Sequence, residues 1–283
     1  MFIYIAIPLF FFISFISVVF LFRKKWKCCV LSICLLYLLN YKTEIMPFNF
    51  GFSKAIDPKL TVYCYNVHGS VPEYRENQEG IALSILRESP DLAFLCEFYL
   101  SKSKVLDSLL TQHSNYLRFY KKGTNCVFYS KYPIDSIEGV YDKPQRCLTN
   151  KINMIIDKDT VTIIGCHLSS SRKNFRLSYL RRCNEADKIL KCLSKEQHPV
   201  VVMGDMNDIS GSYTIERIKS EGMKDAWWEG GCGYGTTYHD KWLRLRLDHI
   251  LYKNDKLNLQ YIKVIDSDLS DHNALVASFA FKN

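Results

Sequence analysis

The stretch His198–Thr214, HPVVVMGDMNDISGSYT, indicates both the fold and the place of its chemistry. Its valines and methionine predict a buried strand over 199–205, because β-branched side chains pack well on a pleated sheet. The strand closes with Gly204, and a carboxylate and a carboxamide follow at Asp205 and Asn207. Ligand sites of α/β proteins gather at strand ends, where the backbone is rigid and side chains reach open space. Both residues are therefore candidates for a functional site.

Short apolar runs with strand character recur along most of the chain. They cover residues 60–67, 91–98, 125–130, 147–156, 160–168, 199–205, 245–252 and 274–281. Between them, residues 79–89 and 174–193 show helical periodicity, with apolar side chains at steps of three or four. Many strands with helices between them predict an α/β fold, in which packed sheets are flanked by helices.

Polar side chains stand at the ends of several of these runs, as Asp205 and Asn207 do. The others are Asn66, Glu97, His167, Asp248, Asp271 and His272. Taken singly, asparagine and aspartate are common turn formers, and a lone histidine is more often a core side chain. Glu97 is harder to explain in this way, since a carboxylate inside an apolar run needs a cation, a donor or a proton. The whole set favours a functional site.

These residue types suit the hydrolysis of a phosphate ester. Carboxylates bind a hard divalent cation such as Mg²⁺, for which Mn²⁺ can substitute, through oxygen ligands. The cation neutralises phosphate charge, while a positioned base orients or deprotonates water for in-line attack. The sequence has no P-loop, no kinase glycine loop and no Gly-x-Ser-x-Gly elbow that would indicate a different chemistry.

Charge argues against a nucleic-acid-binding protein, and the cysteine pattern argues against a protein held together by disulfides or zinc. The formal net charge is +8, but residues 1–42 contain five basic and no acidic residues, which leaves +3 for residues 43–283. This near balance is weak evidence against tight nucleic-acid binding. The eleven cysteines include no Cys-x-x-Cys pair and no zinc-type spacing, so we expect buried free thiols.

The N-terminus has the composition of a membrane anchor. Residues 1–22 carry no charged side chain, RKKWK follows at 23–27, and a second apolar run covers 28–41. We expect transmembrane helices within residues 1–42, a linker over 43–58 and a catalytic domain over 59–283. We expect two spans, which would place the domain on the extracytoplasmic side, because basic residues stay in the cytoplasm. A single span would leave the domain cytoplasmic.

Seven segments, in this order, resemble the successive blocks of the endonuclease/exonuclease/phosphatase superfamily, the deoxyribonuclease-like metallohydrolases. They are YCYNVHG (63–69), DLAFLCEF (91–98), FYSKYPI (128–134), GCHLSSS (165–171), VVMGDMND (201–208), RLDHILY (246–252) and LSDHNALV (269–276). The resemblance runs from Leu60 to Phe281. It implies a four-layer sandwich of two packed mixed β-sheets flanked by helices.

The resemblance also implies a role for each candidate residue. Glu97 would be the principal Mg²⁺ ligand, Asp271 would approach the metal, and Asn66 would lie near the metal and the scissile phosphate. Asp205 would orient or activate the attacking water, and Asn207 would hold the phosphate or Asp205 in place. His272 would contact the phosphate, with Asp248 bonded to its far ring nitrogen to fix the tautomer.

His167 separates branches of this superfamily. A histidine in its block is typical of proteins resembling pancreatic deoxyribonuclease, sphingomyelinases and inositol-phosphate phosphatases, where it helps to protonate the leaving oxygen or to bind phosphate. Apurinic-site endonucleases lack this histidine, so the chain resembles those branches more than it resembles a base-excision repair enzyme. Arg146 is a weaker candidate for a phosphate contact, and His68 is interpreted as a turn residue.

The sequence therefore predicts a membrane-tethered, Mg²⁺-dependent phosphoesterase that hydrolyses a phosphodiester. Nucleic acid, a nucleotide and a lipid headgroup all stay open as its substrate. The alternatives are a phosphomonoesterase, an inert binding module on the same fold, and a membrane assembly protein that binds a structural cation.

Overall fold

The computed structural model describes residues 2–49, 60–69, 76–99, 101, 103–140, 149–170, 174–241 and 243–282, with the backbone alone for 2–7. The helices are α1 (Phe2–Phe22), α2 (Trp26–Thr43), α4 (Gln78–Glu88), α5 (Lys104–Thr111), α6 (Phe175–Leu193), α7 (Tyr213–Lys219) and α8 (Ala226–Gly230). The strands are β1 (Leu60–Asn66), β2 (Leu92–Cys96), β3 (Leu117–Phe119), β4 (Val127–Ser130), β5 (Ile134–Gly139), β6 (Thr149–Ile156), β7 (Asp159–His167), β8 (Val200–Asp205), β9 (Met223–Asp225), β10 (Tyr238–Asp240), β11 (Leu243–Leu245), β12 (Asp248–Lys253), β13 (Leu257–Ile265) and β14 (Ala274–Phe281).

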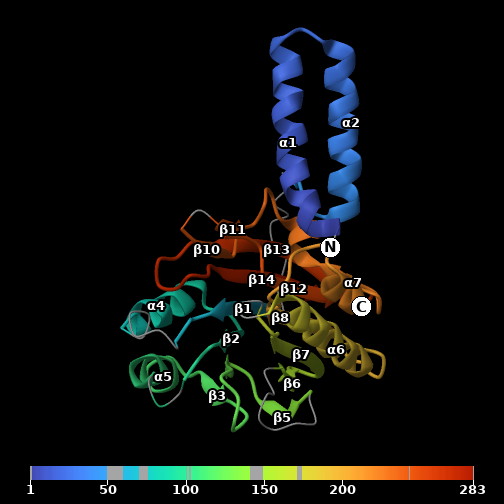
Figure 1. The fold of residues 1–283 in the computed structure, drawn as a ribbon. Coiled ribbons are helices and arrows are strands. Elements are labelled where there is room, and N and C mark those ends of the chain that lie inside the picture. Colours follow the sequence, from blue (N-terminus) through green and yellow to red (C-terminus); the bar gives the residue numbers. More distant parts are fainter. Residues whose placement is uncertain are drawn as a thin grey trace.

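Two six-stranded sheets form the centre of the molecule (Figure 1). Their strand orders are β13-β14-β1-β2-β4-β3 and β5-β6-β7-β8-β12-β9. Each sheet is mixed, because β1 and β2 in one, and β7 and β8 in the other, are parallel while the other paired strands run antiparallel. Parallel neighbours end at the same edge of a sheet, so each sheet brings the carboxyl ends of two central strands together.

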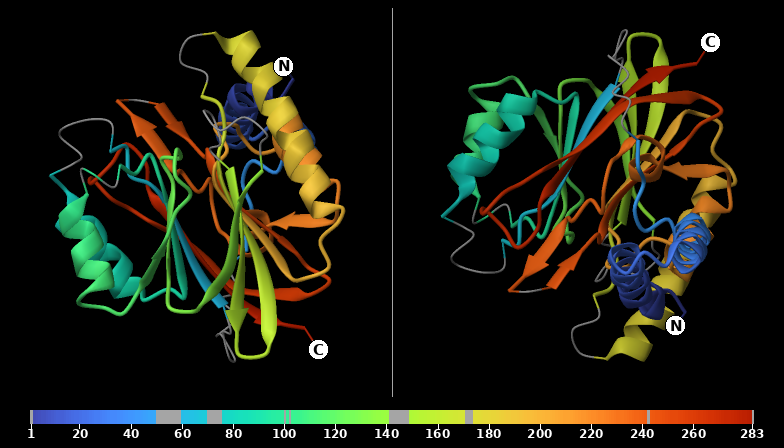
Figure 2. Two further views of the ribbon diagram at one scale, coloured as in Figure 1. Left: turned by 90° about the horizontal axis from the view of Figure 1, so that it is seen from below. Right: turned by 90° about the horizontal axis from the view of Figure 1, so that it is seen from above.

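The sheets pack face to face, and helices cover their outer faces (Figure 2). Between the sheets, the rings of Phe94 and Phe128 lie 4.9 Å apart. Gly165 on β7 faces them so closely that a Cβ there would come within 2.4 Å of the Phe94 ring. A second apolar cluster joins the first sheet to α4 and α5, and a third joins the second sheet to α6 and α7. The predicted sandwich of two mixed sheets flanked by helices is therefore confirmed.

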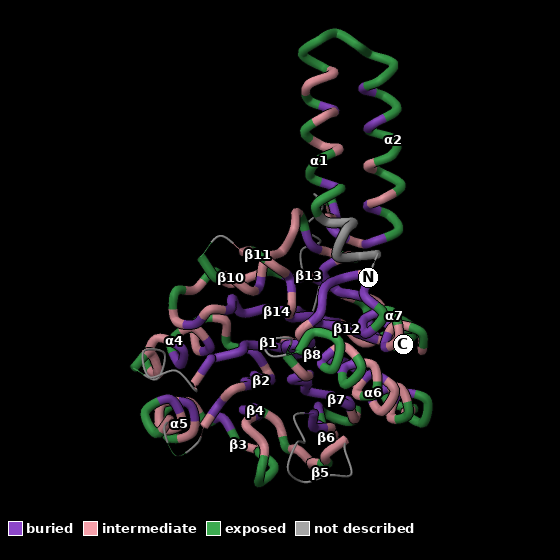
Figure 3. The backbone as a smooth tube through the Cα atoms, viewed as in Figure 1, coloured by how far each residue is buried: buried purple, intermediate pink, exposed green. Residues whose placement is uncertain are grey.

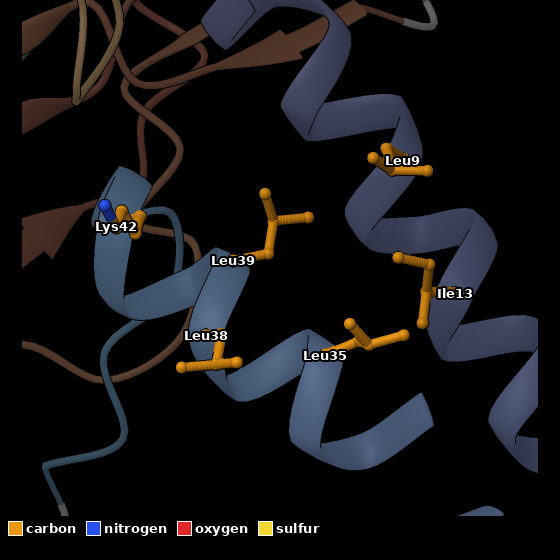
Figure 4. A pocket seen from close by; sticks show the side chains of 6 residues that line it. All are labelled: Leu9, Ile13, Leu35, Leu38, Leu39 and Lys42. Carbon is orange, nitrogen blue, oxygen red and sulfur yellow. The ribbon is translucent and has the colours of Figure 1, made fainter. Parts of the chain in front are cut away.

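The helices α1 and α2 form a hairpin that projects from one end of the sandwich (Figure 1). Arg23, Lys24 and Lys25 make its turn, and the hydroxyl groups of Ser17 and Ser32 bond across it at 2.7 Å. Most side chains described along the hairpin are exposed or half-buried (Figure 3). Towards the sandwich, the two helices enclose a groove (Figure 4), lined by Leu9, Ile13, Leu35, Leu38, Leu39 and Lys42.

The prediction of transmembrane helices is not supported by this structure. Among the residues it describes, no helix combines the length and the apolar character that a bilayer crossing requires. The predicted linker is described only up to Asn49. Its described part lies against the sandwich, where the Asn49 side-chain amide donates to the carbonyl oxygens of Trp228 and Gly231 at 3.0 and 3.1 Å.

Candidate active site

Asp205 lies at the carboxyl end of β8, between the ends of two neighbouring strands. His167 on β7 and Asp248 on β12 are its partners in the sheet register. Gly204 brings β7 and β8 together here, with φ of +141° and no room for a side chain, since a Cβ would lie 1.9 Å from the carbonyl oxygen of Cys166. The glycine that interrupts the valine run is thus required by the backbone that presents Asp205.

The Asp205 carboxylate is the central acceptor of the site. The side-chain amide of Asn66 donates to its Oδ2 at 3.0 Å, across the space between the two sheets. Asn207 donates twice, from its backbone N–H to Oδ1 at 2.8 Å and from its side-chain amide to Oδ2 at 3.1 Å. The Nε2 atoms of His167 and His272 lie 3.8 and 3.9 Å from the same Oδ2. Residues from both sheets therefore converge on one carboxylate.

Glu97 faces Asp205 from the other sheet, directly after β2. Its Oε1 lies 3.2 Å from the amide nitrogen of Asn66 and 3.5 Å from Nε2 of His167. The backbone φ of Glu97 is +53°, and those of Asn207 and His68 are +50° and +44°. Non-glycine residues seldom adopt this conformation, and it is concentrated at functional sites whose surroundings hold it in place.

His272 and Asp248 form a buried pair, with 2.7 Å between Nδ1 and Oδ2. Burial alone would lower the pKa of His272, but the carboxylate of Asp248, helped by Asp205 and Asp271, raises that pKa to about 9. His272 is therefore an imidazolium at neutral pH. Burial raises the pKa of Asp205 above its ordinary value, and the positive charge of His272 opposes this rise. A raised pKa makes a carboxylate a better base near neutral pH.

Asp271 lies beside this cluster and pairs with His68, which follows β1. Nδ1 of His68 is 2.8 Å from Oδ1 of Asp271, so this turn residue also belongs to the site region. The backbone N–H of His68 donates to Oδ1 of Asn66 at 3.0 Å, which connects this pair to the centre. Arg146, the weaker phosphate-binding candidate, falls outside the described residues.

The segment around Thr237 holds two strand ends together. Thr237 is buried, and its hydroxyl oxygen accepts from the backbone N–H groups of Leu247 and Asp248 at 3.0 and 2.9 Å. Its carbonyl oxygen accepts from the N–H of Asn273. Next to it, the ring of Tyr238 lies 5.1 Å from that of His272. Thr237 thus bridges the residues that flank the Asp248–His272 pair.

We expect Thr237→Val to lower both stability and kcat, although valine has nearly the same shape as threonine. The methyl group cannot accept a hydrogen bond, so the buried N–H of Asp248 and the half-buried N–H of Leu247 lose their partner. The cost is about 1–3 kcal/mol in the free energy of unfolding. Loosening the Asp248–His272 pair should lower kcat about tenfold, as loss of supporting carboxylate–histidine contacts does. Chemical denaturation and steady-state kinetics measure both. Thr236→Val is the matched control, because its carbonyl, not its hydroxyl, bonds to Asn273; equal effects in the two variants would contradict this role.

Acidic and imidazole side chains that come from two packed sheets and surround one carboxylate are the arrangement of a phosphate-ester hydrolase. Residues 64–272 match the Endonuclease/Exonuclease/phosphatase family. The match covers well over half of the chain, so the chain belongs to this family and is a hydrolase of phosphate ester bonds. A comparison with curated proteins gives no match.

Solved structures with the same fold come from several sources. A humanized D. rerio TDP2 carrying 14 mutations has a TM-score of 0.66 at 17% identity, over 78% of this chain and 98% of that one. D. rerio TDP2 complexed with a single-strand DNA product has a TM-score of 0.65 at 16% identity, over 79% and 100%. A beta toxin from Staphylococcus aureus has a TM-score of 0.62 at 16% identity, over 77% and 99%. At these identities the likeness concerns the fold alone.

Proposed function

We propose that the chain hydrolyses a phosphodiester by in-line attack of a water molecule activated at Asp205. The observation that carries this proposal is the convergence on one carboxylate of the Asn66 amide at 3.0 Å and of two imidazoles at 3.8 and 3.9 Å. A base beside cationic and hydrogen-bonding groups is the arrangement that attack on a phosphate requires.

The residues divide the reaction between them. Asp205, with its raised pKa, takes a proton from water as the new P–O bond forms. The imidazolium of His272 stabilises the charge that develops on the phosphate oxygens. His167, whose Nε2 lies 3.5 Å from Glu97 and 3.8 Å from Asp205, would give a proton to the leaving oxygen as the ester bond breaks. Asn66 and Asn207 keep the Asp205 carboxylate in one orientation.

The carboxylates of Glu97 and Asp271 are oxygen ligands of the type that Mg²⁺ takes. Among the residues described, no group of three or more His, Cys, Asp or Glu side chains is arranged as a metal site. Mg²⁺ does not need such a group, because it keeps several waters and binds proteins through one or two carboxylates plus substrate phosphate oxygens. Glu97 would hold it, with Asp271 as the second carboxylate. When bound, the cation would neutralise charge on the phosphate.

The substrate classes that suit this site are nucleic acid, a nucleotide and a lipid headgroup. The single-strand DNA product in the related D. rerio structure supports nucleic acid. The exposed apolar hairpin supports a lipid (Figure 3). Because the domain carries little net charge, its affinity for a polyanion would depend on local contacts rather than on long-range attraction.

The test is a panel of substrates offered to the full chain with Mg²⁺ present. Bis-p-nitrophenyl phosphate reports generic phosphodiester hydrolysis, and single-stranded DNA, RNA, sphingomyelin and phosphoinositides report the natural class. p-Nitrophenyl phosphate tests the monoesterase alternative. We expect turnover of the generic diester that exceeds turnover of the monoester. A properly folded chain that hydrolyses none of them would support the inert binding module instead.

We also propose that the α1–α2 hairpin attaches the chain to a membrane, with the catalytic domain on the extracytoplasmic side. Support comes from its large apolar side chains that face outwards, among them Phe12, Phe15 and Phe22, and from the basic residues of its turn. Fractionation should recover the chain with membranes, and protease added to intact cells should digest the domain. Recovery in the supernatant would contradict attachment to a membrane. A domain protected from protease would contradict its place on the extracytoplasmic side.

A further inference from the structure

The base of the hairpin packs against the loop that carries two of the candidate catalytic residues. Phe10 of α1, Ile45 after α2 and Ile209 form a buried apolar cluster, with 7%, 2% and 3% of their surfaces exposed. Ile209 follows Asn207 by two residues and Asp205 by four. An apolar contact of the hairpin therefore lies on the catalytic loop itself.

The same cluster reaches the start of β12, which carries Asp248, the partner of His272. Leu245 and Leu247 pack against it, and Leu247 directly precedes Asp248. The carbonyl oxygen of Leu247 accepts from the N–H of Met206 at 3.0 Å, which joins this segment to the catalytic loop. Thus the hairpin covers both segments that meet at the centre of the site.

Polar contacts fix the hairpin base in one position. Glu44 pairs with Lys219 of α7 at 2.7 Å, and both side chains are largely buried. Asn40 closes the turn after α2, donating to the carbonyl oxygen of Met46 and accepting from its N–H. An anchor joined to the domain by a flexible linker would need none of these contacts. Attachment to a membrane requires only the parts of α1 and α2 that lie away from the sandwich.

We propose that the α1–α2 hairpin is a positioning element of the active site, which holds the loop from Met206 to Ser212 so that Asp205 and Asn207 keep their geometry. This inference rests on the proposed hydrolysis at Asp205. It gives the N-terminal helices a role in catalysis that is independent of any contact with lipid.

The chain offers a matched pair of variants on one helix. Phe10 is buried in the docking cluster, whereas Phe12, two residues away, is 60% exposed. In the full chain, kept soluble with a mild detergent, Phe10→Ala should lower kcat for bis-p-nitrophenyl phosphate about tenfold and leave KM unchanged, as loss of an interaction made only in the transition state does. Phe12→Ala should match wild type, and Phe10→Leu should recover most of the activity.

Hydrogen exchange separates the positioning role from general destabilisation and from failure of the proposed function. In Phe10→Ala, the N–H groups of Met206 and Ser212, which bond to Leu247 and Ile209, should exchange faster, while those of β1 and β2 stay as protected as in wild type. Equal exchange at Met206 and Ser212 in the two alanine variants would overturn the inference, even if no substrate is hydrolysed. Faster exchange there with undiminished kcat would also overturn it. An inactive wild type with the expected exchange pattern would count against the proposed hydrolysis alone.

Discussion

Asp205→Ala will lower kcat by about 10²- to 10⁴-fold, the full range that a positioned general base contributes. The two neighbouring carboxylates already have partners, since Asp248 pairs with His272 at 2.7 Å and Glu97 accepts from Asn66 at 3.2 Å. Alanine cannot accept a proton from water, and it also releases the amide groups of Asn66 and Asn207 that now bond to Asp205. The kcat for a generic phosphodiester measures this loss.

The fold should survive this change. Burial raises the pKa of Asp205, so the folded state disfavours its charge, and alanine removes that cost together with the hydrogen bonds. We expect a melting temperature within a few degrees of that of wild type. Asp187→Ala is the control, since Asp187 lies on the surface and pairs with Arg217; its activity should be that of wild type. Near-normal activity in Asp205→Ala would show that another group activates the water.

Removal of divalent cations will abolish turnover, and Glu97→Gln will reproduce much of that loss. A bound cation supplies several kcal/mol of charge stabilisation to the transition state, and about 4 kcal/mol corresponds to a rate change of about 10³-fold. Glutamine keeps the size of Glu97 but removes its charge. Activity measured against Mg²⁺ concentration should therefore show weaker binding, with partial recovery at high Mg²⁺.

Two controls make this prediction specific. Mg²⁺ or Mn²⁺ added after chelation should restore wild-type turnover, whereas Ca²⁺ tests whether any divalent ion suffices. Glu229→Gln alters a surface carboxylate that pairs with Lys224 at 3.3 Å and should not change the Mg²⁺ dependence. Turnover that persists in chelator, or a Mg²⁺ titration of Glu97→Gln identical to that of wild type, would remove Glu97 from the metal site.

Much of the sandwich follows from local patterns in the sequence. Each of the eight apolar runs contains a strand, because a fully buried strand needs an uninterrupted apolar segment. The strand β13, LNLQYIKVI, was missed: its burial is only partial, and its polar residues interrupt the apolar run. The short strands β3, β9, β10 and β11 have three residues each, too few for a periodic signal.

The candidate site was predictable where a functional residue stands at the end of such a run. Asn66, His167 and Asp205 occupy these positions, and the structure brings them together. Thr237 was not predictable, because its role depends on accepting backbone N–H groups ten and eleven residues away. The pairing of His68 with Asp271 joins segments about two hundred residues apart, and no spacing within either segment indicates it.

The buried ion pairs behind the site were also missed. Arg182 of α6 donates to Asp208 at 3.2 Å, and Arg246 donates to Asp225 at 2.8 Å. Single charged residues in a helix or a loop are usually solvated, so their sequence context gives no sign of burial. The hairpin shows the opposite error. Its apolar composition suggested an anchor alone, and the cluster that joins Phe10 and Ile45 to Ile209 emerges only from the tertiary structure.

The most direct test of the central claim is a crystal structure of the full chain with Mn²⁺ and a non-hydrolysable phosphodiester analogue. Anomalous scattering locates the manganese independently of the protein atoms. We predict manganese on the Glu97 carboxylate, and a phosphorus atom between it and the imidazoles of His167 and His272, with Asp205 facing that phosphorus. Manganese and phosphate bound elsewhere, with Glu97 and Asp205 contacting neither, would contradict the account.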